Sequence, residues 1–115
     1  TCLAREVVPG EEIAASLSTS DCLQEGFTQP FYTKIYEFTA TAGQRAVIRV
    51  NSPNTDPYIF LYGPGGIYLA EDDDSGGGLN SRIPAAGSLV LPLEGKYRIL
   101  VTTAFAGQTG SFTLN

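Results

Sequence analysis

Apolar side chains recur at every second position along much of this chain, and that period constrains the fold more than any other feature. In the stretch that ends at Thr103, the side chains of Tyr97, Ile99 and Val101 share one parity, and the charged Arg98 lies between them. Successive side chains of a β-strand point to opposite faces, so a period of two is the pattern of a half-buried strand in an antiparallel sheet. The chain is therefore expected to be an all-β protein.

Further stretches with strand character are separated by short segments rich in residues that favour turns, such as glycine, proline and asparagine. The predicted strands are 11–17, 32–40, 45–51, 58–62, 67–70, 88–92, 96–103 and 110–114. Residues 11–17 could instead form a short helix, because glutamate and alanine favour helices. Seven or eight short strands bounded by turns predict a jelly-roll-like antiparallel β-sandwich.

The inward side chains of these strands are expected to meet in one shared interior. Its members should include Ile48, Leu61, Ile99 and Phe112, each at an inward position of a different predicted strand. Residues 58–62 are apolar or aromatic at every position, which is typical of a strand that is covered on both faces. This strand is therefore predicted to lie in the centre of its sheet.

Length, charge and hydropathy exclude several classes of protein. The 115 residues fit one domain, so residues 1–115 are expected to form a single β-sandwich domain. A net charge of −5 argues against nucleic acid as a partner. No apolar run approaches the roughly 18 residues that span a bilayer as a helix, so membrane insertion is not expected.

Two cysteines, Cys2 and Cys22, flank the N-terminal segment. Their separation does not match a metal or redox motif, and we predict a disulfide between them in preference to two free thiols. The bond would close a loop of about 20 residues and stabilise the fold by roughly 3 kcal/mol. Residues 1–30 would then be a disulfide-stapled segment of a secreted, periplasmic or cell-surface protein.

An acidic, glycine-rich loop follows the predicted strand 67–70. Carboxylate and amide oxygens are the ligands that calcium prefers, and another acidic residue precedes strand 58–62. The candidate metal ligands are Asp56, Asp72, Asp73, Asp74 and Asn80. The alternative is a solvated acidic turn, in which an aspartate accepts backbone N–H bonds or Arg82 pairs with the acids. The spacing is not that of an EF-hand.

The residue inventory argues against catalysis. The chain has no histidine, so it can form neither a Ser-His-Asp nor a Cys-His arrangement, and it lacks the usual zinc ligand. We therefore expect a protein that is not an enzyme. A set of aromatic residues could form a binding face or could instead be core and cross-strand pairs. These residues are Tyr32, Tyr58, Phe60, Tyr62 and Tyr68.

Five short motifs follow one another between residues 36 and 114. They are Tyr36-Glu37-Phe38-Thr39-Ala40-Thr41-Ala42-Gly43-Gln44, Leu61-Tyr62-Gly63-Pro64-x-Gly66, Asp72-Asp73-Asp74-Ser75-Gly76-Gly77-Gly78-x-Asn80-Ser81-Arg82-Ile83, Gly95-x-Tyr97-x-Ile99-x-Val101 and Gly107-x-x-Gly110-Ser111-Phe112-Thr113-Leu114. In this order they resemble the bacterial pre-peptidase C-terminal domain family, over about residues 33–115.

The resemblance implies a secreted β-sandwich that is appended to extracellular enzymes, often proteases, or repeated in surface proteins. The similar collagen-binding domains of clostridial collagenases bind calcium and use a tyrosine-rich penultimate strand as their ligand surface. Here the outward residues of that strand are Arg98, Leu100 and Thr102, which argues against collagen binding.

The expected function is that of a non-catalytic accessory domain for adhesion, substrate targeting, or secretion and maturation of a larger extracellular protein. Calcium is the candidate cofactor, with the solvated acidic turn as its alternative. The expected partners are other domains of that protein and an extracellular polymer or protein. A purely structural spacer in a surface protein is the alternative.

Overall fold

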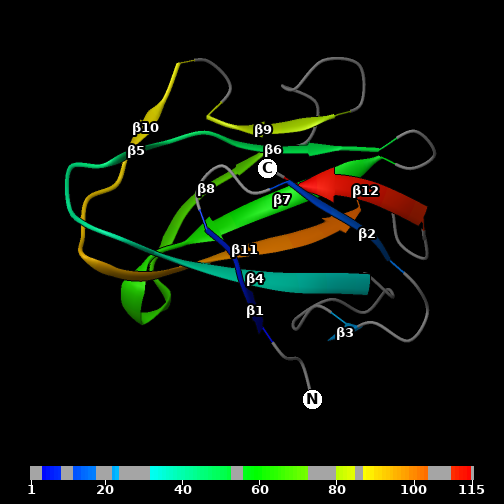
Figure 1. The fold of residues 1–115 in the computed structure, drawn as a ribbon, viewed down its shortest axis with the longest axis horizontal. Coiled ribbons are helices and arrows are strands. Elements are labelled where there is room, and N and C mark those ends of the chain that lie inside the picture. Colours follow the sequence, from blue (N-terminus) through cyan, green and yellow to red (C-terminus); the bar gives the residue numbers. More distant parts are fainter. Residues whose placement is uncertain are drawn as a thin grey trace.

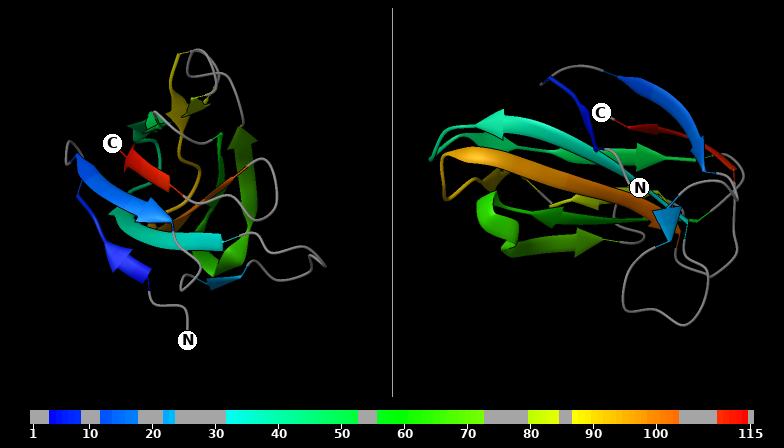
Figure 2. Two further views of the ribbon diagram at one scale, coloured as in Figure 1. Left: turned by 90° about the vertical axis from the view of Figure 1, so that its right-hand side faces the viewer. Right: turned by 90° about the horizontal axis from the view of Figure 1, so that it is seen from below.

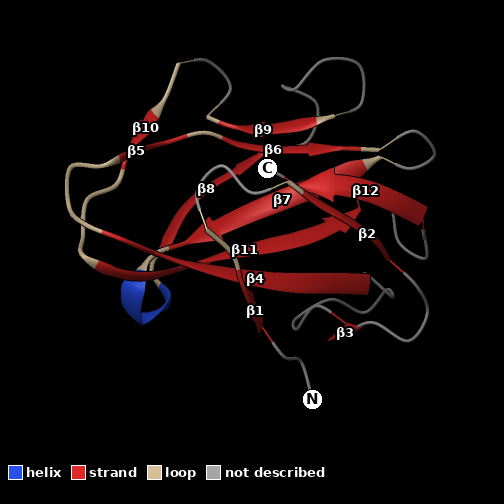
Figure 3. Cartoon of the chain, viewed as in Figure 1, coloured by secondary structure: helices blue, strands red, loops and turns tan. Residues whose placement is uncertain are grey.

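Two β-sheets lie face to face and enclose a shared apolar core (Figures 1 and 2). The computed structural model describes residues 4–8, 12–17, 22–23, 32–52, 56–72, 80–84, 87–103 and 110–114. Strands make up most of these residues, as Figure 3 shows. The sandwich predicted from the period of two is confirmed.

The described residues form twelve strands and one short 3-10 helix. The elements are β1 (Ala4–Glu6), β2 (Ile13–Leu17), β3 (Cys22–Leu23), β4 (Tyr32–Ala40), β5 (Arg45–Ala46), β6 (Ile48–Asn51), β7 (Pro57–Tyr62), η1 (Pro64–Gly66), β8 (Tyr68–Asp72), β9 (Ser81–Ile83), β10 (Leu89–Val90), β11 (Gly95–Thr103) and β12 (Gly110–Leu114). Within these ranges, no helix is long and apolar enough to cross a membrane.

The larger sheet has the order β1-β4-β11-β7-β8, and β3 pairs with β4 beside this path. Its pairings are antiparallel except that β1 runs parallel to β4. The smaller sheet has the order β2-β12-β6-β9, and β5 and β10 form a two-stranded ribbon at one end (Figure 1). The core lies between the two larger layers.

Inward residues from both sheets form one buried cluster. Ile59, Leu61 and Val101 of the larger sheet are fully buried, as is Val50 of the smaller sheet. The predicted shared interior is confirmed, because Ile48, Leu61, Ile99 and Phe112 all belong to this cluster. The period of two therefore assigned the inward faces correctly.

The number of strands among the described residues differs from the prediction. Twelve strands replace the predicted seven or eight, and the added ones have two or three residues each. The predicted strand 45–51 is divided at Val47, which is 37% exposed, and the strand predicted over 88–92 is reduced to Leu89–Val90. The jelly-roll connectivity is not confirmed by these pairings. Residues 13–17 form a strand and not the alternative helix.

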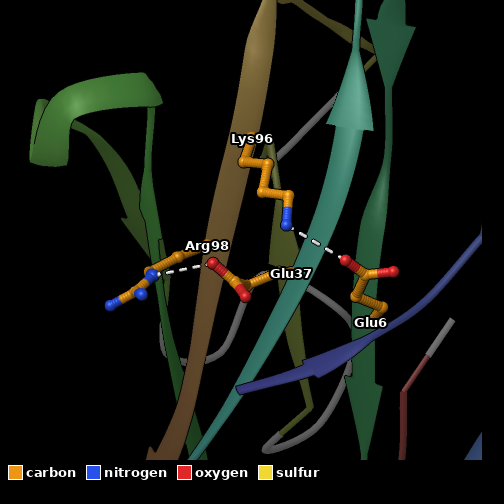
Figure 4. Close-up of polar contacts among 4 residues, drawn as sticks. All are labelled: Glu6, Glu37, Lys96 and Arg98. Carbon is orange, nitrogen blue, oxygen red and sulfur yellow. Dashed lines mark hydrogen bonds and ion pairs between the residues drawn. The ribbon is translucent and has the colours of Figure 1, made fainter. Parts of the chain in front are cut away.

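Two ion pairs lie on the larger sheet beside the edge strand β1, and one of them binds β1 itself. Parallel pairing brings Glu6 beside Glu37, which would place two like charges together. Figure 4 shows the side chain of Lys96 crossing over β4 to reach Glu6, and Arg98 meeting Glu37, each at 3.0 Å. The Glu6 carboxylate raises the pKa of Lys96 by accepting a hydrogen bond from it. The two cations thus compensate for the acidic pair.

Candidate functional site

An aromatic row covers part of the outer face of β7, the side that points away from the core. Alternation along this strand sends Ile59 and Leu61 inward and leaves Tyr58, Phe60 and Tyr62 half-buried on the outside. The ring centroids of Tyr58 and Phe60 are 5.0 Å apart, and those of Phe60 and Tyr62 are 6.5 Å apart. Successive outward rings of one strand therefore form a continuous row.

Tyr68 of β8 extends this row across the strand pair. Antiparallel pairing places Tyr68 opposite Tyr62, and the two rings meet edge to face at a centroid distance of 6.0 Å. Tyr68 is 52% exposed, so one side of its ring faces solvent. We call the four residues Tyr58, Phe60, Tyr62 and Tyr68 the aromatic face.

Glu71 of β8 ties two hydroxyl groups of the aromatic face together. Its carboxylate accepts a hydrogen bond from Tyr68 Oη at 2.7 Å and another from Tyr58 Oη. These two bonds, that of Tyr58 first, lower the pKa of Glu71 because they stabilise the charged carboxylate. The bond to Glu71 in turn raises the pKa of Tyr68. The rings are thus held in place at their polar ends.

The neighbouring strand β11 supplies the rest of this surface. Register places Leu100 beside Phe60 and Arg98 beside Tyr62 on the same outer side of the sheet. Leu100 is half-buried and Arg98 is exposed. A surface of held aromatic rings beside an aliphatic and a cationic side chain is suited to contact with a polymer or protein, because rings combine large apolar area with hydrogen-bonding edges.

The sequence left two interpretations of the five aromatic residues open, and the structure combines them. Tyr58, Phe60, Tyr62 and Tyr68 are neighbours within and across strands, and they also lie on an outer surface. Tyr32 lies in β4, and β11 lies between β4 and β7 in the sheet. Tyr32 is therefore not next to the other four. The prediction that residues 58–62 are covered on both faces is wrong for the outer face, because that side is half-buried.

Polar residues at the start of β9 connect the two sheets near the predicted calcium ligands. Ser81 Oγ donates to the carbonyl oxygen of Pro57 at 2.7 Å. The backbone N–H of Arg82 donates to Asp72 Oδ2 at 2.7 Å, and Asn80 Oδ1 accepts from the N–H of Ser52 at 3.0 Å. The described candidate ligands Asp72 and Asn80 are therefore engaged in bonds to backbone amides.

Asp56 stands apart from these two residues, because one of its carboxylate oxygens has no partner. The residue is 8% exposed, and its Oδ1 is buried without a hydrogen bond. A buried carboxylate oxygen in this state is costly unless a donor or a cation meets it, so the residue fits a calcium ligand. Among the described residues, no group of three or more acidic or cysteine side chains is placed to hold a metal ion.

The remaining site predictions fall partly outside the described residues. Asp73 and Asp74 lie outside the described residues, so calcium binding remains a prediction. Cys2 also lies outside them, and of Cys22 only the backbone pairing in β3 is described. The disulfide therefore remains a prediction as well.

The side chain of Arg82, which was considered as a partner of the acidic loop, binds two backbone carbonyl groups that follow β9. Its guanidinium donates to the carbonyl oxygens of Pro84 at 2.7 Å and of Gly87 at 2.8 Å. The backbone N–H of Arg82 donates to Asp72 Oδ2. Asp73 and Asp74 lie outside the described residues, so the pairing of Arg82 with the acidic loop remains a prediction.

Sequence reasoning missed Glu71 as part of a site. Its spacing from Tyr68 is visible in the sequence, but its bond to Tyr58 depends on the pairing of β7 with β8. The predicted hairpin of these two strands is confirmed, and from its register the contact could have been inferred.

Comparison with solved structures shows which known proteins share this fold. The pre-peptidase C-terminal domain of a collagenase from Bacillus anthracis matches with a TM-score of 0.71 and 16% identity, over 100% of this chain and 95% of that one. The resemblance predicted from the sequence is confirmed as a likeness of fold. The sequence matches no protein-family model and no curated protein.

A periplasmic inhibitor of g-type lysozyme from Aeromonas hydrophila has a similar fold, with a TM-score of 0.64 and 18% identity over 96% of this chain and 91% of the inhibitor. The corresponding inhibitor from Salmonella Typhimurium matches with a TM-score of 0.53 and 18% identity, over 96% and 94% of the two chains. The fold is thus found both in a domain of a larger enzyme and in an inhibitor protein.

Proposed function

We propose that this chain is a non-catalytic accessory domain of a larger extracellular protein, and that the aromatic face attaches that protein to an extracellular polymer or protein. The observation that carries the proposal is the partly exposed row of adjoining rings on β7 and β8. Aromatic side chains are enriched at binding surfaces because they bury a large area while few rotatable bonds become fixed.

The position of these rings bears on the comparison with collagen-binding domains. The outward residues of β11 lack tyrosine, but β7 lies beside β11 in the same sheet and presents its rings on the same side. The aromatic surface is thus moved by one strand and gains a cation, Arg98, at its border. We infer that this chain binds its ligand on the same sheet as the collagen-binding domains do. The kind of ligand that it prefers is different.

Three features support a non-catalytic, extracellular role. The chain has no histidine to serve as a general base. The similar folds belong to a domain of a collagenase and to periplasmic inhibitors. The predicted disulfide requires an oxidising compartment.

Retention on insoluble polymers tests the proposal. The chain is mixed with fibrillar collagen, chitin, cellulose and bacterial cell-wall sacculi, and the bound fraction is measured after sedimentation. Retention on at least one polymer is expected, and Phe60→Ala should weaken it about tenfold or more, because central aromatic residues dominate binding energies. Leu93→Ala is the matched control, since Leu93 is 42% exposed and lies away from the aromatic face. Equal retention of both variants, or none by the unchanged chain, would leave the structural spacer as the function.

We further propose that calcium stabilises the domain through Asp56, together with Asp72, Asp73, Asp74 and Asn80. The bound ion would neutralise the acidic loop and meet the unpartnered Oδ1 of Asp56. At a concentration about 100 times its dissociation constant, calcium should add about 2.7 kcal/mol to stability and raise the melting temperature by several degrees.

Melting curves with calcium and with chelator test this second part. Asp56→Asn should lose most of the calcium-dependent shift, whereas Glu94→Gln, an exposed acid in the turn before β11, should keep it. Identical melting temperatures with millimolar calcium and with chelator would refute calcium binding without affecting the role of the aromatic face.

A second candidate function is inhibition of a lysozyme. It is favoured by the likeness in fold to two lysozyme inhibitors over nearly their whole lengths. Turbidity assays of cell-wall lysis by g-type lysozyme, with and without an excess of this chain, test it. Slower lysis would support this candidate, and an unchanged rate would remove it.

A further inference from the structure

An apolar cavity of about 220 Å³ opens between the two sheets, on the other side of the larger sheet from the aromatic face. Its walls come from β4, β5 and β6 and from the segment that follows β1 (Figure 1). Its floor is formed by core side chains, among them Ile48, Leu91, Ile99 and Leu114, each at most 5% exposed. The core is thus open to a space at this point, although protein interiors normally pack without voids of this size.

The mouth of the cavity carries exposed apolar side chains. Val8 is 65% exposed and Val47 is 37% exposed, and both line the opening. Val47 is the residue at which the predicted strand 45–51 breaks into β5 and β6. The break separates the ribbon of β5 and β10 from the smaller sheet, and Val47 remains exposed beside it. An apolar lining that continues from floor to rim is suited to an apolar ligand.

The walls of the opening are held by backbone hydrogen bonds. The N–H of Gly43 donates to the carbonyl oxygen of Leu91 at 2.8 Å. The N–H of Leu91 donates to the carbonyl oxygen of Gln44 at 2.7 Å. Antiparallel pairing of β5 with β10 adds to this support. The cavity therefore has a fixed shape on this side before any ligand arrives, which reduces the entropic cost of binding.

One cation lies at the opening. Arg45 lines the cavity, is exposed, and donates from Nη1 to Ser88 Oγ at 3.2 Å. None of the described residues that line the cavity is acidic, and the described part of the chain shows no ion pair to Arg45. The guanidinium can therefore bind an anion at the edge of an apolar space, which is a site for a molecule with a carboxylate at one end.

We propose that this cavity binds small amphipathic carboxylates, with the apolar body on the floor and the carboxylate at Arg45. An apolar cavity of about 150 Å³ accommodates benzene, so this larger space suits a body and head of roughly six to nine non-hydrogen atoms together. Short aliphatic acids and simple aromatic acids have this size. The site is separate from the aromatic face, and its occupation does not depend on the proposed function.

Titration of the 115-residue chain with hexanoate, hexan-1-ol and hexylamine tests the proposal, followed by the methyl signals of Val8, Val47 and Leu91 in NMR spectra. Hexanoate should shift these signals saturably with a 1:1 stoichiometry. Hexan-1-ol, which lacks the charge, should bind about tenfold more weakly, and hexylamine more weakly still. The absence of saturable shifts in these methyl groups would overturn the proposal.

Three variants separate the contributions. Arg45→Gln should weaken hexanoate about tenfold and leave hexan-1-ol unchanged, because only the charged hydrogen bond is lost. Arg49→Gln is the matched control, since Arg49 is an exposed arginine of β6 that does not line the cavity. Ala46→Leu should fill the space and abolish binding of both ligands. Equal losses in the two arginine variants, or full binding by a folded Ala46→Leu chain, would overturn the proposal. If Ala46→Leu does not fold, the arginine pair decides alone.

Discussion

The two faces of β7 are built from different kinds of side chain, aliphatic on one and aromatic on the other. The inner face, Ile59 and Leu61, is fully buried between the sheets. The outer face, Tyr58, Phe60 and Tyr62, is half-buried; its neighbouring rings lie in contact, and Glu71 accepts a hydrogen bond from Tyr58. Aliphatic side chains fill an interior, whereas rings with polar edges can remain at a surface because their hydroxyl groups find partners there. The aliphatic or aromatic character of the side chains therefore distinguishes the two faces.

The largest loss of stability is expected from a substitution on the inner face of β7. Leu61→Ala removes a fully buried side chain and leaves a cavity, so the free energy of unfolding should fall by about 2–5 kcal/mol. Urea unfolding followed by circular dichroism measures the loss. A cost below that of Phe60→Ala would contradict the assignment of the two faces.

The next effect concerns the turn between β10 and β11, which supports the inner face. Gly95 has φ of +141°, and a Cβ there would lie 2.9 Å from Pro64 Cγ. Gly95→Ala should therefore lower the free energy of unfolding by about 1–3 kcal/mol. Gly65→Ala is a useful comparison, because its φ of +79° is also positive but no atom lies within 4 Å of the added group. An equal cost for both variants would show that the contact with Pro64 is unimportant.

A smaller effect on stability is expected on the outer face. Phe60 is half-buried, so Phe60→Ala should cost about 1 kcal/mol, which is roughly the value for half of a buried phenylalanine side chain. The same chemical denaturation experiment gives this value. A loss as large as that of Leu61→Ala would show that the outer face is part of the stabilising core and would weaken its assignment to binding.

The smallest expected effect is a pH dependence of stability that arises from Glu71 at the outer face. Hydrogen bonds from Tyr58 and Tyr68 lower the pKa of Glu71 below its ordinary value of 4.5, so this carboxylate stabilises the fold above that pH. The contribution is lost as the pH falls through the lowered pKa, and exposure to solvent keeps it below about 1 kcal/mol. Glu71→Gln should remove this part of the pH dependence. A Glu71 carboxyl that titrates at or above 4.5 in NMR spectra would contradict the bonding described.

Much of the fold followed from the alternation of apolar residues, since the inward positions depend on period and not on strand length. Tyr97, Ile99 and Phe112 are buried as predicted. The short strands could not be predicted in this way. A strand of three residues such as β1 carries too few positions to show a period, and its parallel pairing with β4 depends on contacts far apart in the sequence.

The candidate site was less accessible from the sequence. The aromatic residues were recognised, but their outward direction depends on which face of β7 meets the second sheet, and both faces are apolar. The cavity carries no sequence motif, because it arises where residues of several strands fail to fill a space. Among the candidate calcium ligands, the burial of Asp56 was not apparent from a position in a loop.

The parallel attachment of β1 has a mechanical consequence. Over the described residues, β1 contacts its sheet along three residue pairs with β4, supported by the Lys96–Glu6 bond. The predicted disulfide between Cys2 and Cys22 would enclose β1 in a closed loop, so tension applied before Cys2 would pass to β3 and leave β1 unloaded. After reduction of that bond, the three residue pairs of β1 with β4 would be loaded before the seven-residue register of β4 with β11. Because Val7 and Val8 follow β1 and line the cavity, the resistance of the opening to stretching would then depend on the redox state of the two cysteines.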